Sequence, residues 1–162
     1  HVRLESVVLC NLGIVTERRG QRGEALAQFE AAVRIAQALG DPRYEGQFLG
    51  YLGRLQARQG EHAEARRCLD AGEALLRSAA DPYDLGVLLT SRAEAHHLAG
   101  ELESATASLQ AAGSIAGNLG VGPASELGLA LARVRKLCGG PVPPLPAADA
   151  PKSAIAAPGA TS

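Results

Sequence analysis

The sequence has 162 residues, with 16 basic and 17 acidic side chains and a formal net charge of −1. This length suits one domain of ordinary size, and a charge so near zero gives no long-range attraction to nucleic acid or to an anionic membrane surface. Three tyrosines and two phenylalanines are the only aromatic residues, so Ala, Leu and Val must build the core, which favours closely packed helices over a thick sheet sandwich.

The sequence also indicates where the protein resides. No apolar run reaches the ~18–20 residues of a membrane span, and the first residues lack the pattern of a signal peptide. The sequence lacks methionine and begins at His1, which predicts a fragment or processed piece of a longer protein. Cys10, Cys68 and Cys138 are far apart, and such a scattered, odd set argues against a disulfide framework and for a reducing, cytoplasmic compartment.

Small and apolar residues recur along the sequence with a period of 40 residues. A fixed period of this length is the signature of a repeat architecture that stacks similar units. The columns that share this spacing are Gly20, Gly60 and Gly100; Ala25, Ala65 and Ala105; Phe29, Leu69 and Leu109; Leu9, Leu49, Leu89 and Leu129; and Asp41-Pro42 with Asp81-Pro82.

Each period predicts two helices. The first helix, over about residues 4–19, places its apolar residues on one stripe with helical spacing, and Gly20 supplies the left-handed residue that ends it. The stripe of this first helix is Val8, Leu9, Leu12 and Val15. The stripe of the second helix is Ala25, Phe29, Ala32, Val33 and Ala36.

Helix-start signals mark the later periods. Asp41 and Asp81 are predicted N-caps, and the proline after each one lies at the first helical position, where a missing N–H costs nothing. Asp84 can return a capping-box bond to Asp81. These signals predict three helix pairs, over about residues 3–40, 41–80 and 81–120.

A seventh helix is predicted over about residues 124–138. It carries a basic side (Arg133, Arg135, Lys136) and an apolar side (Leu127, Leu131, Val134), a pattern typical of the polar-faced cap that ends a solenoid. No equivalent cap precedes the first helix. We therefore expect the first helix to pack against a missing repeat or to mediate self-association.

The sequence changes character after this helix. Residues 1–138 are predicted to form one repeat array. Residues 139–162 hold six of the nine prolines, interleaved with alanine and with few charges. Such a segment cannot bury enough apolar surface to order itself, so we expect a disordered tail.

The repeat columns resemble the tetratricopeptide repeat family. The first copy matches at Leu9, Leu12-Gly13, Ala25, Phe29 and Ala32; the second at Leu49, Leu52-Gly53, Ala65 and Leu69; the third at Leu89, Ala93, Ala105, Leu109 and Ala112. Gly72 and Arg92 depart from the pattern, and leucine replaces the usual tryptophan. The 40-residue period and the strings Asn11-Leu12-Gly13, Glu24-Ala25-Leu26 and Gly40-Asp41 resemble a subclass found in bacterial signalling and regulatory proteins.

The resemblance implies an all-α fold, a right-handed superhelical solenoid of three antiparallel helix pairs with a C-terminal capping helix. It implies a scaffold that binds a protein or peptide in its concave groove. Two alternatives remain open: a regulatory arm of a bacterial kinase, cyclase, ATPase or transcription regulator, and a structural spacer or self-association segment.

The resemblance also places candidate peptide-binding residues in the groove: Asn11, Glu17, Arg18, Tyr51, Arg54, Arg58, Glu94 and His97. Arg54 and Arg58 lie one helical turn apart. They can bind an acidic group as bidentate donors, or they can form a solvated face with local salt bridges.

Metal binding and catalysis are not predicted. Adjacent residues point about 100° apart on a helix, so His96 and His97 cannot both ligate one metal ion. The sequence has no phosphate-binding loop, no nucleophile elbow and no metalloprotease motif. We expect a non-enzyme without metal or cofactor, whose partner is a protein or peptide rather than nucleic acid or membrane.

Overall fold

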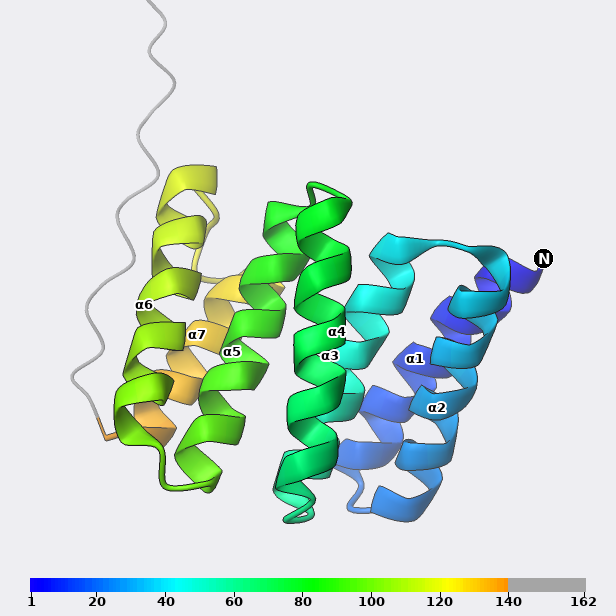
Figure 1. Ribbon diagram of the computed structural model, residues 1–162, viewed down its shortest axis with the longest axis horizontal. Coiled ribbons are helices and arrows are strands. Elements are labelled where there is room, and N and C mark those ends of the chain that lie inside the picture. Colours follow the sequence, from blue (N-terminus) through cyan, green and yellow to red (C-terminus); the bar gives the residue numbers. More distant parts are fainter. Residues whose placement is uncertain (140–162) are drawn as a thin grey trace, which may run out of the picture.

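The computed structural model describes residues 1–139, which form seven helices and no strand (Figure 1). This arrangement confirms the predicted all-α, solenoid-like class. The helices are α1 (Val2–Arg18), α2 (Arg22–Leu39), α3 (Pro42–Arg58), α4 (His62–Ser78), α5 (Pro82–Leu98), α6 (Leu102–Leu119) and α7 (Glu126–Leu137). From residue 140 onward, the predicted tail lies outside the described residues.

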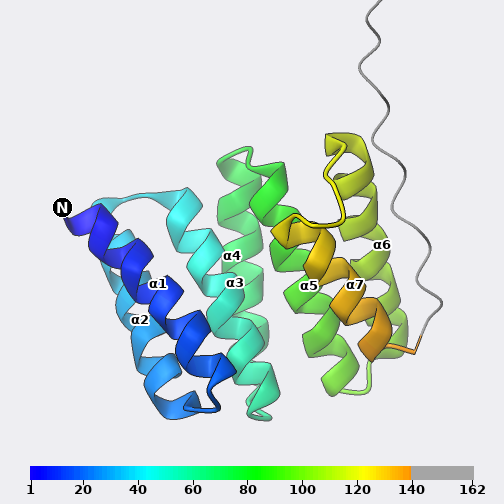
Figure 2. The ribbon, with the colours of Figure 1, turned by 180° about the vertical axis from the view of Figure 1, so that it is seen from behind.

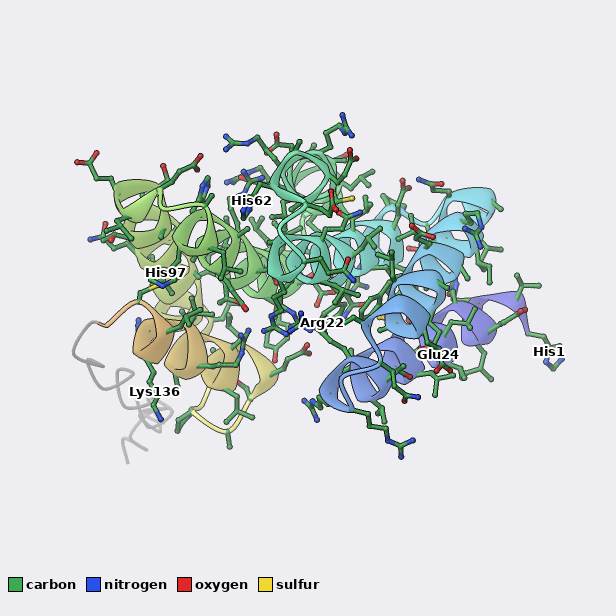
Figure 3. All side chains as sticks on the ribbon, turned by 90° about the horizontal axis from the view of Figure 1, so that it is seen from below. His1, Arg22, Glu24, His62, His97 and Lys136 are labelled. Atoms are coloured by element: carbon green, nitrogen blue, oxygen red, sulfur yellow. The ribbon has the colours of Figure 1, made fainter. Side chains whose placement is uncertain are left out.

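The helices form two layers. Figure 2 shows α1, α3, α5 and α7 side by side in one layer, and α2, α4 and α6 form the other. Seen from below in Figure 3, the array is bent, with α1 and α7 at its two ends on the same side of α3. No helix within residues 1–139 is long and apolar enough to cross a membrane.

The predicted helix ends are found in the structure. Gly20 ends α1 with a φ of 79°, the left-handed conformation that glycine adopts without strain. The Asp41 carboxylate caps α3 by accepting from the Tyr44 N–H at 3.4 Å, and the Asp81 carboxylate caps α5 by accepting from the Asp84 N–H at 3.1 Å. These caps bond backbone N–H groups that a helix start otherwise leaves unpaired.

The predicted capping-box bond from Asp84 back to Asp81 is wrong. The Asp81 N–H instead donates to the carbonyl of Leu76 at the end of α4, at 3.1 Å. The Asp84 carboxylate accepts from Gln47 on α3, at 3.3 Å. The helix junction supplies an acceptor for the N–H, so the Asp84 side chain is free to link α5 with α3.

The predicted apolar stripe of α1 is not the face that this helix buries. Val8, Leu12 and Val15 are exposed, with exposed fractions of 53%, 46% and 43%. The buried side is a row of small residues, Ser6, Cys10, Gly13 and Thr16. Small side chains let α1 approach α2 closely, and no helix of the described residues covers the outer stripe.

The stripe predicted for α2 is confirmed, because Ala25, Phe29, Ala32, Val33 and Ala36 are all buried. Phe29 fills the space beside Gly13 of α1, where an added Cβ would lie only 2.8 Å from the ring. Gly53 and Leu69 repeat this arrangement between α3 and α4, again at 2.8 Å. In the first two helix pairs, a large residue on the second helix therefore packs onto a glycine of the first, whereas the third pair has Ala93 at this position.

Gly46 and Gly72 bring the backbones of α3 and α4 into direct contact. A Cβ added to Gly72 would lie 2.9 Å from the carbonyl oxygen of Gly46, and a Cβ added to Gly46 would lie 3.0 Å from that of Gly72. A backbone oxygen cannot rotate away as a side chain can. This contact explains why Gly72 replaces the alanine that the other repeats carry.

We expect Gly72→Ala to lower the free energy of unfolding by about 1–3 kcal/mol, because the added methyl forces α3 and α4 apart. Gly23→Ala, in the first turn of α2 with no atom within 4 Å of the added Cβ, is the matched control. Its free energy of unfolding should rise by about 0.4–1 kcal/mol, because alanine lowers the conformational entropy of the unfolded chain. Urea denaturation measures both, and equal effects would refute the close contact.

Candidate functional site

A groove of about 770 Å³ lies on the concave side of the array, where α1, α3, α5 and α7 contribute its lining. These four helices face the viewer in Figure 2. Their other sides pack against the second layer, so the faces left over line the groove. Its volume falls within the ~300–1,000 Å³ typical of ligand sites.

The groove has an apolar floor and two walls. Phe48 of α3 and Val87 of α5 belong to the floor and are almost completely buried. Ile14 lines the groove from α1, and Leu129 and Ala130 line it from α7. Leu129 is 60% exposed, so a large apolar side chain is available on this wall.

One end of the groove holds an ion-paired network that begins on α1. The Glu17 carboxylate accepts from Arg54 Nη2 at 2.8 Å and from Arg58 Nη1 at 2.6 Å. Glu17 is only 7% exposed as a side chain, and Arg54 is 13% exposed. Both oxygens of this nearly buried carboxylate are therefore bound by arginines of α3.

The network continues across α5 to α7. Arg58 Nε and Nη2 donate to the two oxygens of Glu94, at 2.6 and 3.1 Å, and Arg133 Nη1 of α7 donates to the same carboxylate at 2.6 Å. We call Glu17, Arg54, Arg58, Glu94 and Arg133 the arginine–glutamate ladder. It connects all four helices that line the groove.

The ladder shifts the pKa of Glu94, its carboxylate on α5. Burial acts to raise the pKa of Glu94, but hydrogen bonds from Arg58 and Arg133 outweigh burial and hold the pKa below its usual value. Burial likewise acts to lower the pKa of Arg58, yet its bonds to the two glutamates raise it. Glu94 and Arg58 are therefore charged at neutral pH.

A second link joins α3 to α7. The Tyr51 hydroxyl donates to the Glu126 carboxylate, and the Arg54 guanidinium lies over the Tyr51 ring, 5.3 Å from its centroid. Burial, with the nearby Glu126, raises the pKa of Tyr51 and raises that of Cys10 to about 12. Cys10 is therefore a neutral thiol, which makes it unsuited to nucleophilic chemistry.

The structure brings together most of the residues that the sequence singled out. Six of them line the groove: Asn11, Glu17, Arg18, Tyr51, Arg54 and Arg58. Arg54 and Arg58 do not form a solvated face, because they bridge to neighbouring helices through the ladder. Glu94 is buried beneath the lining. A role in binding stays a prediction for each of these residues.

His97 does not line the groove. Figure 3 shows it at the end of the array that α7 occupies, and its Nδ1 is buried without a hydrogen-bond partner among the described residues. Its neighbour His96 bonds to Glu101 at 2.5 Å. Within residues 1–139, no three His, Cys, Asp or Glu side chains lie close enough together to hold a metal ion.

Sequence reasoning did not place α7 in the groove. Its polar side was interpreted as a solvent-facing cap, yet Glu126, Leu129, Ala130 and Arg133 all line the groove. Their spacing puts them on one helix face, and Leu129 belongs to the 40-residue leucine column. This spacing was the available signal. The apolar side of α7, Leu127, Leu131 and Val134, is fully buried as predicted.

A family model described as "Tetratricopeptide repeat" matches residues 4–78. The match covers nearly all of α1 and the whole of α2, α3 and α4. The helices from α5 onward lie beyond the match, and α5 and α6 keep the same 40-residue spacing. A search of curated proteins gives no match.

We expect Glu94→Gln to lower the free energy of unfolding by about 1.5–3 kcal/mol at pH 7, because charge-assisted bonds on a buried carboxylate are lost. The folded pKa of Glu94 lies below its unfolded value. The stabilisation is therefore complete above the unfolded value of ~4.3 and is lost as the pH falls through the folded pKa.

Urea denaturation of the wild type and of Glu94→Gln at pH 7 and at pH 3 tests this expectation. The difference between their free energies of unfolding should be smaller at pH 3 than at pH 7. Glu64→Gln is the control, since it removes only a surface pair with Arg67 on the same helix. A difference that is the same at both pH values would contradict the role of the ladder.

Proposed function

We propose that this chain, whose residues 4–78 belong to the tetratricopeptide repeat family, is a non-catalytic module that binds a peptide segment of a partner protein in the groove. Tetratricopeptide repeats generally mediate protein–protein interaction. The observation that carries the proposal is the groove itself, a 770 Å³ hollow lined by four helices.

The lining suits a peptide. Ile14 and Leu129 offer apolar contacts on opposite walls, and the arginines of the ladder offer hydrogen-bond donors at one end. A few well-placed polar groups beside apolar walls give orientation and specificity to a bound chain. The ladder and the bond from Tyr51 to Glu126 hold the four helices in place, so little ordering is needed when the ligand binds.

The resemblance to regulatory arrays with a 40-residue period supports a more specific role. On this basis the chain is a regulatory arm of a larger bacterial signalling protein in the cytoplasm, and its ligand is a partner protein or another domain of the same parent. A catalytic or DNA-binding domain encoded beside the array would support this role over that of an independent scaffold.

Filling the groove tests the proposal. Random 12-residue peptides displayed on phage are selected on the wild-type chain, and the enriched peptides are then measured on two variants by fluorescence anisotropy. Ala130→Trp places an indole in the groove from α7. Ala132→Trp places it on an exposed position of the same helix that does not line the groove.

We expect the enriched peptides to bind the wild type and Ala132→Trp equally, and to bind Ala130→Trp at least tenfold more weakly. Circular dichroism confirms that both variants keep their helices. Peptides that bind all three proteins with the same affinity would show that recognition lies outside the groove.

The outer face of α1 favours a second candidate function, association with another copy of the chain. Val8, Leu12 and Val15 form an exposed apolar stripe on this face. Forty residues further on, Phe48, Leu52 and Leu55 occupy the same positions and are buried. The stripe therefore has the pattern of a surface that another helix covers.

Sedimentation equilibrium over a range of concentrations tests this second candidate. The wild type should dimerise, and Val8→Glu/Leu12→Glu should be monomeric, because charges in the stripe oppose burial. Leu102→Glu, on a leucine of α6 that is 61% exposed, is the control and should still dimerise. A wild type that stays monomeric at high concentration would exclude self-association.

A further inference from the structure

We infer that the peptide bound in the groove carries an acidic side chain, aspartate or glutamate, which the groove arginines hold at the ladder end. The inference rests on the proposed peptide-binding function and names the chemistry of its ligand. It follows from the charge of the lining, from the hydrogen-bond donors left over in the ladder, and from the burial of Arg54.

The groove is more positive than the rest of the molecule. Its lining includes four arginines, Arg18, Arg54, Arg58 and Arg133, and two carboxylates, those of Glu17 and Glu126. Glu94 lies beneath the lining and pairs with two of these arginines, so the arginines still outnumber the carboxylates by one. The whole chain has a net charge of −1. A concave site that concentrates positive charge on a slightly negative molecule attracts an anionic group.

The ladder has more donors than acceptors. All four oxygens of Glu17 and Glu94 already accept from arginines. Each guanidinium carries five N–H groups, yet Arg54 and Arg133 each donate one bond within the ladder. Arg54 Nε is buried and has no partner among the described residues. The spare N–H groups that a ligand can reach are above all those of Arg133, whose side chain is 40% exposed. They suit an acceptor such as a carboxylate.

Arg54 is held in place for this contact. Its guanidinium lies over the Tyr51 ring, and its side chain is only 13% exposed. A guanidinium stacked on an aromatic ring loses little freedom when it binds a carboxylate. Low exposure to water also strengthens charge-assisted hydrogen bonds. A carboxylate that reaches Arg54 would therefore bind more tightly than one on an open surface.

A double-mutant cycle tests the inference with peptides selected on the wild-type chain. Each Asp or Glu of a peptide is replaced by Asn or Gln, and dissociation constants are measured by fluorescence anisotropy. On the protein side, Arg54→Gln/Arg133→Gln removes the arginines with spare donors. Arg58 still pairs with Glu17 and Glu94 in this variant. Arg77→Gln, which alters a surface pair on α4, is the control.

We expect one Asp or Glu in each peptide whose neutralisation weakens binding to the wild type and to Arg77→Gln by at least tenfold. On Arg54→Gln/Arg133→Gln the same replacement should change binding by less than threefold, because its partners are gone. If these arginines had only a structural role, the double variant would bind all peptides more weakly. Neutralising the acidic residue of a peptide would then still weaken its binding to this variant by tenfold.

Three outcomes would overturn the inference. Peptides that Ala130→Trp excludes, but whose acidic residues can all be neutralised without loss, would leave the proposed function standing and show that the ligand is not acidic. Loss of affinity on C-terminal amidation alone would identify the terminal carboxylate as the bound anion. Binding that tightens at least tenfold when a selected peptide is phosphorylated, while its Asp and Glu residues can be neutralised without loss, would identify a phosphate instead.

Discussion

Close contact between the two helices of each repeat is the constraint on which the rest of the structure depends. Glycine at Gly13, Gly46 and Gly53 lets a large residue or a backbone of the neighbouring helix lie where a side chain would otherwise be. The two layers can then share a core built mostly of Ala, Leu and Val. Because this contact uses only one side of α1, α3, α5 and α7, their other sides remain available and together line the groove.

Ion pairs then hold together the four helices that line this groove. The arginine–glutamate ladder crosses from α1 to α7, and its carboxylates at Glu17 and Glu94 are nearly buried. A buried carboxylate without partners would be costly, so the four helices must stay close enough for the arginines to reach it. The same arginines have donors to spare. One set of residues thus holds the helices of the concave face together and supplies the donors for the acidic ligand that we propose.

The sequence predicted the local structure well and the tertiary relations less well. Helices, glycine ends and aspartate caps depend on neighbouring residues, so the 40-residue period was enough to find them. Apolar spacing marked a stripe on α1, with Val8 and Leu12 among its residues, but it could not say which face the helix buries, because that depends on the neighbour that covers it. The ladder could not be found at all, since Glu17 and Arg54 meet only after the helices have packed. The sequence did contain a signal that α7 lines the groove, because the spacing of Glu126, Leu129 and Arg133 puts them on one face of this helix.

The measurement that tests the central claim most directly is a ¹⁵N chemical-shift titration of the chain with a selected peptide. Recognition in the groove predicts that the largest amide shifts fall on groove-lining residues such as Asn11, Ile14 and Ala130, while α2, α4 and α6 change little. Shifts concentrated on α4, or on the outer stripe of α1 around Val8, would contradict the account and place binding on another surface.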